Sequence, residues 1–183
     1  FINSTIVGNN GIGVFCNRSS DIQIINSIVY NNDSQIFIDY VLGNQSSVTI
    51  SYSIIEDGIN GVTIYNSGGT LDWGDGNLDY NPLFVDGENK DYHLSNYSPA
   101  IGAGTTTGSP STDINGTARP SPSGSNPDIG AYENALGSPS APPVPTNLAA
   151  TVGNGVVNLS WTGNATSYSV YRSTTSGSGF TAI

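Results

Sequence analysis

Methionine is absent from this sequence of 183 residues, and cysteine and histidine occur once each. Because a complete chain usually keeps an internal methionine, we expect these residues to be a segment of a longer protein that begins within a domain. The single Cys16 excludes a disulfide bond within the segment. We expect Cys16 to be a buried apolar side chain, as free cysteines usually are. A catalytic thiol would need a nearby histidine, and His93 lies far along the chain.

Basic residues are scarce: 4 Lys and Arg oppose 14 Asp and Glu, which gives a net charge of −10. This negative field repels phosphate backbones, so nucleic acid is excluded as an expected partner. It favours calcium or neutral glycans over acidic polymers, because the basic residues are scattered. They are Arg18, Lys90, Arg119 and Arg172.

Long apolar runs are also missing. No stretch approaches the roughly 20 apolar residues of a membrane helix, so no membrane span is expected. No signal-peptide pattern opens the chain, and we expect any export signal to lie upstream. Charged residues make up only 10% of the sequence, while Asn, Ser, Thr and Gly are abundant. Polarity without charge, together with many β-branched residues, predicts an all-β extracellular protein.

The first third of the chain contains a repeated motif. Residues 2–10 (INSTIVGNN) return as 24–32 (IINSIVYNN) and as 50–58 (ISYSIIEDG). Aligning Thr5 with Ser27 and Ser53 gives spacings of about 22 and 26 residues. Strict alternation before the second and third copies has the period of a β-strand.

A unit of this length cannot bury its apolar face alone, so stacking of successive coils into a right-handed parallel β-helix is predicted. Matching aliphatic residues should form ladders, each buried side chain contributing about 1.5–3 kcal/mol. Asn and Asp in the copies should occupy corners with left-handed backbone. A β-sandwich is disfavoured because sandwich strands recur every 8–12 residues without copying a motif. The predicted ladders are Ile6, Ile28 and Ile54, and Val7, Val29 and Ile55; the predicted corners are Asn9, Asn31 and Asp57.

From Gly58 the repeat gives way to predicted loops and a series of short motifs. They are residues 76–86 (GNLDYNPLFVD), 91–94 (DYHL), 98–104 (SPAIGAG), 112–116 (TDING), 119–120 (RP) and 128–133 (DIGAYE). In this order they resemble the C-terminal end of bacterial right-handed β-helix proteins of the choice-of-anchor Q type. The resemblance covers residues 1–134, with Asn81 and Gly102 where the family commonly has Asp.

These motifs are predicted to be structural rather than binding elements, because aromatic and aliphatic residues dominate them. Pro82 and Pro99 restrict their preceding residues to extended backbone. Residues 128–132 are expected to return across the open end of the coils and cover it. Residues 1–136 are therefore predicted to be the last coils and cap of the β-helix.

Residues 137–145 are rich in proline and predict a semi-rigid linker. The following residues, 146–183, resemble the first strands of a fibronectin type III domain, a β-sandwich. The matching residues are Pro145, Leu148, 157–161 (VNLSW) and 168–173 (YSVYRS). Such modules usually act as spacers or carbohydrate-contacting accessories in bacterial extracellular enzymes.

The sequence contains no recognisable active site. Relatives of such β-helices bind or cleave acidic polysaccharides by β-elimination, which needs a basic side chain beside a neutralised carboxylate. Arg18 and Lys90 do not share a ladder position, so no lyase site is predicted. A hydrolase would need convergent carboxylates, and the acids on consecutive coils are interpreted as solvated turn residues. They are Asp33, Asp39, Glu56 and Asp57. His93 is interpreted as a structural residue in a buried strand.

The candidate metal site is a calcium site at Asp75, Asn77 and Asp79, with Asn81 continuing the alternation. Alternating oxygen ligands point to one side of an extended chain. An EF-hand loop is excluded, because Tyr80 stands where its glycine is required. A plain acidic turn is the alternative. No other cofactor is indicated.

Two functions are consistent with these patterns. In the first, the segment is the structural C-terminal end of a secreted bacterial polysaccharide lyase or hydrolase whose catalytic coils lie upstream. In the second, the parent is a non-catalytic cell-surface or adhesion protein that uses the β-helix as a rod. Both place the protein outside the cell, with a polysaccharide or surface glycan as its partner. Fold analogy favours the enzyme.

Overall fold

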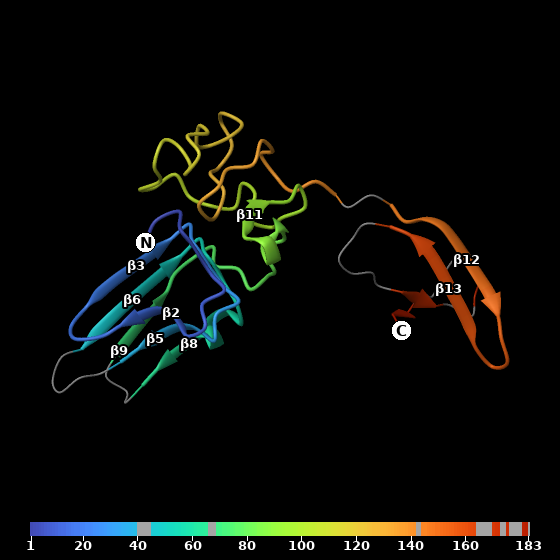
Figure 1. The fold of residues 1–183 in the computed structure, drawn as a ribbon, viewed down its shortest axis with the longest axis horizontal. Coiled ribbons are helices and arrows are strands. Elements are labelled where there is room, and N and C mark those ends of the chain that lie inside the picture. The colour runs from blue at the N-terminus through green and yellow to red at the C-terminus, as the bar shows by residue number, and fades with distance from the viewer. Residues whose placement is uncertain are drawn as a thin grey trace. The chain divides into compact units, whose positions relative to one another are not determined.

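A computed structural model describes residues 1–39, 45–65, 69–141, 144–163, 170–172, 175 and 181–182. The chain forms two compact units, Phe1–Ser140 and Ala141–Ile183 (Figure 1). Each unit is described by itself. The predicted linker begins within the first unit, where the Ser140 N–H donates to Asn96 O at 2.7 Å.

The first unit is built on three parallel three-stranded sheets. Each coil contributes one strand to each sheet, so strands adjacent in a sheet are three strands apart in sequence (Figure 1). This arrangement fits a β-helix-like fold and confirms the predicted all-β class. The sheets are β1 (Thr5–Val7), β4 (Ile28–Tyr30) and β7 (Ile54–Ile55); β2 (Ile12–Cys16), β5 (Ser34–Ile38) and β8 (Val62–Ile64); and β3 (Asp21–Ile25), β6 (Ser46–Ser51) and β9 (Gly69–Trp73).

The register between the first two coils differs by one residue from the predicted alignment. Ile28 pairs with Ile54 as expected, but its partner in the first coil is Thr5. Ile6 pairs with Val29, so the predicted ladder of Ile6, Ile28 and Ile54 is wrong at its first rung. A one-residue shift exchanges the two faces of a strand. The shared tripeptide Ile-Asn-Ser at 2–4 and 25–27 carries the correct alignment.

The serines that end this tripeptide explain why the register is fixed. Ser4 N donates to Ser27 Oγ, and Ser27 N donates to Ser53 Oγ, across spacings of 23 and 26 residues. Ser53 N then donates to Asn77 Oδ1, 24 residues on. Each coil thus offers a side-chain oxygen to a backbone N–H of the coil before it. A slip by one residue would leave these buried donors unpaired, at about 1–3 kcal/mol each.

Two rows of left-handed corners accompany this register. One row precedes the serines and has positive φ at Asn3, Asn26, Tyr52 and Gly76. The other has positive φ at Gly8, Asn31 and Asp57. The predicted corners at Asn31 and Asp57 are confirmed, whereas the first-coil corner is Gly8 rather than Asn9, because of the same one-residue shift.

The coils continue beyond Gly58, where the sequence predicted loops. Strands β8 and β9 complete the third coil, and Leu78 forms a parallel bridge with Ile54 at the start of a fourth. The sequence signal for these strands is weak because β8 has only three residues, β9 begins with Gly69, and both strands lie at the edge of their sheets. Edge positions bury less apolar surface and tolerate polar residues.

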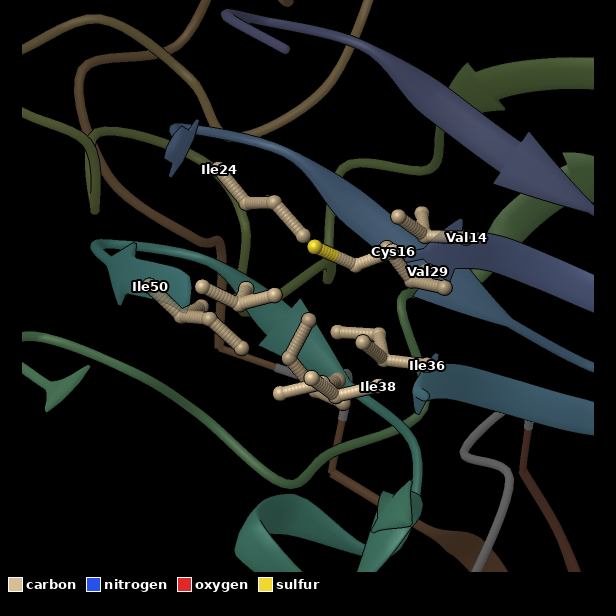
Figure 2. Close-up of a cluster of buried hydrophobic side chains, with 9 residues drawn as sticks. Val14, Cys16, Ile24, Val29, Ile36, Ile38 and Ile50 are labelled. Atoms are coloured by element: carbon tan, nitrogen blue, oxygen red, sulfur yellow. The ribbon is translucent and has the colours of Figure 1, made fainter. Parts of the chain in front are cut away.

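The interior between the three sheets is filled with aliphatic side chains (Figure 2). Cys16 lies among them with no exposed surface, which confirms its predicted apolar role. Burial raises the pKa of the Cys16 thiol, and its Sγ lies 3.5 Å from Ser20 O. The buried members are Val14, Cys16, Ile24, Val29, Ile36, Ile38, Val48, Ile50 and Ile55.

A second apolar cluster lies on the opposite face of sheet β1–β4–β7. Ile28 and Ile54 point away from the coil interior and pack against residues of the C-terminal segment 94–136 (Figure 1, green to orange). This sheet is therefore buried on both sides. The buried members are Ile28, Ile54, Leu94, Ala100, Ile101 and Ile129. A short antiparallel pair, β10 (Phe84–Asp86) with β11 (Asp91–Leu94), introduces the segment.

The segment 128–132 covers this flank rather than the open end of the coils, which corrects the predicted cap. Gly130 N donates to Asn26 O at 2.7 Å, and Ala131 N donates to Thr5 Oγ1 at 3.0 Å. Gly130 has φ of 108°, and a Cβ there would lie 2.8 Å from Ile28 Cδ1. The motif fits this position because its glycine permits close contact with the sheet.

Four charged side chains hold the segment together from within. Arg119 Nε lies 2.9 Å from Glu133 Oε2, with both side chains almost completely buried. Asp128 accepts the N–H groups of Gly102 and Asn134 at 2.7 and 2.6 Å. Burial raises the pKa of Asp128 to about 7 and also raises the pKa of Glu133.

The fourth of these side chains, Asp113, behaves differently. Burial opposes its ionisation, but the backbone N–H groups of Glu133, Thr117 and Asn115 outweigh burial and hold the pKa of Asp113 below its usual range.

The second unit contains the antiparallel pair β12 (Thr146–Val152) and β13 (Val157–Thr162) and the antiparallel pair β14 (Tyr171–Arg172) and β15 (Thr181–Ala182). The predicted strand 157–161 is confirmed as β13. Tyr168 and Ser169 of the next predicted strand lie outside the described residues.

Truncating Ile28 should destabilise the first unit strongly, because this side chain links the coils to the C-terminal segment. We expect Ile28→Ala to lower the free energy of unfolding by about 2–5 kcal/mol. Ile59→Ala is the matched control, since Ile59 is 53% exposed, and should cost less than about 0.5 kcal/mol. Urea denaturation monitored by circular dichroism measures both. Equal effects would contradict the two-sided burial of this sheet.

Stability should fall as the pH rises from 5 to 8. The folded pKa of Asp128, about 7, lies above the ordinary value near 3.9. The folded state therefore holds a proton that the unfolded state releases, and this stabilisation is lost as the pH passes 7. We expect Asp128 to account for roughly 1–3 kcal/mol of the fall.

Asp128→Asn should show a smaller fall between these pH values, whatever its absolute stability. Asp72→Asn removes the same charge from an exposed position on β9 and should retain the wild-type dependence. Urea denaturation at the two pH values gives the comparison, and an identical fall in all three proteins would refute the role of Asp128.

Candidate functional site

The outer face of sheet β2–β5–β8 combines exposed aromatic rings with a polar groove. Val14, Cys16, Ile36 and Ile38 point into the core. Because side chains alternate along a strand, the residues between them face outward. We refer to this outer face, which carries a row of aromatic rings and a polar groove, as the β5 face.

The aromatic row consists of Phe15, Phe37 and Tyr65. Phe15 and Phe37 are partners in the parallel register, with ring centroids 5.9 Å apart. The Tyr65 ring lies 6.0 Å from that of Phe37. Phe15 and Tyr65 are 48% and 53% exposed. Three coils therefore present a contiguous row of rings to solvent, an arrangement typical of interaction surfaces.

The groove lies beside this row and has a volume of about 380 Å³. Thr63 connects the two features, because it lines the groove and is the register partner of Phe37. The other lining residues are Asn31, Asn32, Asp33, Ser34, Gln35, Glu56, Asp57, Asn60 and Gly61. Nearly all of these carry hydrogen-bonding side chains.

A network of side-chain amides fixes the floor of the groove. Asn32 Oδ1 accepts from Asn9 Nδ2 at 2.8 Å, and Asn32 Nδ2 donates to Gln35 Oε1 at 2.8 Å. Gln35 Nε2 donates to Glu56 Oε2 at 2.7 Å, and Asn31 N donates to the same oxygen at 2.7 Å. The network crosses three coils, so the polar floor is rigid before any ligand binds.

Glycines keep the floor open on both sides of Gln35. A Cβ at Gly13 would lie 2.8 Å from Gln35 O, and a Cβ at Gly61 would collide with Glu56 O. Neither position can carry a side chain without displacing backbone.

The electrostatic environment of the groove is negative. Asp33 and Asp57 are exposed, and Glu56 is half-buried. No Lys or Arg is among the described residues that line the groove. Nearby Tyr30 reports the same field: burial raises the pKa of its hydroxyl, and the charges of Glu56, Asp79 and Asp57 raise it further.

This arrangement suits binding of polyhydroxylated molecules. Amide and carboxylate groups can accept and donate hydrogen bonds to hydroxyls, while the aromatic faces pack against apolar ring surfaces. Of the acids considered in sequence, Asp33, Glu56 and Asp57 line the groove. Glu56 already accepts two hydrogen bonds, consistent with a structural role.

Sequence reasoning overlooked the aromatic row and Gln35. The signal was present in the alternation of β2 and β5, where Phe15 and Phe37 occupy the positions between core residues. Their contact with Tyr65 depends on the coil register, which the repeat alignment placed one residue off in the first coil.

The three calcium candidates lie at the start of the fourth coil. Asn77 is turned inward: its Oδ1 accepts from Ser53 N, and its Nδ2 donates to Ile50 O at 2.9 Å and Gly74 O at 3.1 Å. Asp75 and Asp79 are exposed. Within the described ranges, no three His, Cys, Asp or Glu side chains gather as a metal cluster. The calcium site stays a prediction, with Asn77 occupied by backbone partners.

His93 is exposed rather than buried, because it lies on the outward side of β11. Its Nδ1 is 2.5 Å from Asp91 Oδ1, its Nε2 is 3.0 Å from Asn115 Nδ2, and its ring stacks on Tyr132 at 4.1 Å. These contacts hold β11 against the C-terminal segment. The hydrogen bond to His93 lowers the pKa of Asp91.

No family model, no curated protein and no solved structure matches this chain. Within the part of the chain that the structure describes, no helix has the length and apolar character needed to span a membrane.

Removing the Asn77 amide should destabilise the coils even without calcium. We expect Asn77→Ala to lower the free energy of unfolding by about 1–3 kcal/mol in EDTA, because it leaves Ser53 N and two carbonyls without partners. Asn10→Ala, at an exposed position, is the control and should be nearly neutral. Thermal unfolding of both variants, in EDTA and in calcium, measures these stability differences. If Asn77→Ala lowered stability only in the presence of calcium, Asn77 would instead be assigned to an ion site.

Proposed function

We propose that this chain is part of a secreted or cell-surface bacterial protein that binds polysaccharide, with residues 1–136 forming the C-terminal end of a right-handed parallel β-helix. The observation that carries the proposal is the β5 face, where a row of exposed rings adjoins a rigid groove of hydrogen-bonding groups. The family resemblance of residues 1–134 is consistent with it.

Physical chemistry favours a glycan as the ligand of such a face. A pyranose ring presents C–H groups on its faces and hydroxyls around its edge. Aromatic rings pack on the C–H groups through their negative faces, and a preformed polar groove can satisfy the hydroxyls with little loss of entropy. The face crosses successive coils, as an elongated polymer requires.

The parent protein is proposed to be a polysaccharide lyase or hydrolase whose catalytic coils lie upstream. In this proposal the segment contributes binding, and residues 146–183, as the beginning of a fibronectin type III domain, form a spacer.

A non-catalytic surface or adhesion protein is the second candidate. It is favoured by the hydrogen-bonded ladder of Ser4, Ser27, Ser53 and Asn77. Such inter-coil bonds repeat along the stack and make a stiff rod. We expect no product release from alginate, pectin or chondroitin by this segment under either proposal.

Removing the central ring should weaken polysaccharide binding. We expect Phe37→Ala to weaken retention on insoluble or gel-embedded polysaccharides at least tenfold, because Phe37 contacts both neighbouring rings. Tyr80→Ala is the matched control, since Tyr80 is 63% exposed outside this face. Affinity electrophoresis across a panel of neutral, amino and acidic polysaccharides measures retention. Retention unchanged by Phe37→Ala in a folded protein, or absent for every polymer, would refute the proposal.

A further inference from the structure

The spacing of the aromatic row carries information about the direction of the bound polymer. Phe15 and Phe37 are register partners whose ring centroids lie 5.9 Å apart. Tyr65 lies two residues beyond Thr63, the register partner of Phe37, and its ring centroid is 6.0 Å from that of Phe37. A polymer that runs across the strands, parallel to the coil axis, can therefore contact one ring on each coil.

The charge beside the row specifies the chemistry of that polymer. Asp33, Glu56 and Asp57 line the groove from two successive coils, and the described lining contains no cation to balance them. Uronates and sulfated sugars would be repelled at this short range. A protonated amine is attracted by the carboxylates and also by the aromatic faces, through cation–π interaction. Both features of the β5 face therefore prefer positive charge.

We propose that the β5 face binds a polysaccharide with free amino groups, such as a β-1,4-linked glucosamine polymer. The inference rests on the proposed polysaccharide-binding function. Sugar rings pack on Phe15, Phe37 and Tyr65, and the ammonium groups enter the groove beside Asp33 and Asp57. Glu56 and Gln35 hold the floor, as their mutual hydrogen bond requires.

The test uses three hexamers that share a β-1,4-linked backbone and differ at carbon 2: glucosamine, N-acetylglucosamine and glucose. We expect calorimetry with the full chain at pH 6, where the polymer amines are protonated, to give at least tenfold tighter binding of the glucosamine hexamer. The preference should shrink as salt is raised, because screening weakens ionic attraction.

Two variants separate charge recognition from ring recognition. The double variant Asp33→Asn with Asp57→Asn removes both charges, and asparagine is as well suited to these turns as aspartate. It should reduce the preference for the glucosamine hexamer to less than threefold and leave binding of the N-acetylglucosamine hexamer unchanged. Phe37→Ala should weaken all three hexamers. Asp72→Asn, on the outer side of another sheet, changes the charge without touching the face and should behave as wild type. Circular dichroism verifies the fold of each variant.

The outcomes distinguish failure of the amino-sugar preference from failure of polysaccharide binding as a whole. Equal binding of the three hexamers, or a preference that survives the Asp33/Asp57 double variant, overturns the amino-sugar inference and leaves polysaccharide binding intact. Failure of every hexamer to bind overturns both. A lysine hexamer that binds as tightly as the glucosamine hexamer, with no effect of Phe37→Ala, would identify non-specific cation attraction and also overturn the inference.

Discussion

The parallel pairing of one coil with the next is the constraint on which the rest of the first unit depends. Backbone hydrogen bonds fix the coil spacing, and side-chain oxygens such as Ser27 Oγ and Ser53 Oγ fix the register at one corner. With both set, Val29 and Ile55 enter the interior, while Ile28 and Ile54 are directed to the opposite face. A shift of one residue would exchange these two groups between the two buried clusters and break the hydrogen bonds to Ser27 and Ser53.

Burial of sheet β1–β4–β7 on both faces explains the C-terminal segment. Its short motifs have little regular structure, but Ile101 and Ile129 pack in one cluster with the outward aliphatic residues of the coils. Buried polar groups are then necessary to hold irregular backbone. Asp113, Asp128 and Glu133 accept backbone N–H groups, and Arg119 partly compensates their charge. The segment therefore acts as a side wall of the coils.

The β5 face differs because no part of the described C-terminal segment covers its rings. Phe15 and Tyr65 remain about half exposed beside a polar floor. Contiguous exposed apolar groups of this kind usually mark an interaction site. The same stacking of coils that builds the core brings these rings together and places Asp33 and Asp57 along one groove. Stability and proposed binding thus depend on one geometric repeat, with inward residues serving the first and outward residues the second.

The sequence alone determined the all-β class, the stacking of units of 20 to 30 residues, the corners at Asn31 and Asp57 and the buried state of Cys16. These follow from local alternation, turn chemistry and repetition, which act over a few residues. The tertiary structure decided the register of the first coil, the side-wall position of residues 128–132, the exposure of His93, and the meeting of Phe15, Phe37 and Tyr65. Each of these depends on contacts between residues about 20 to 130 positions apart, and local sequence does not encode which face such distant residues will share.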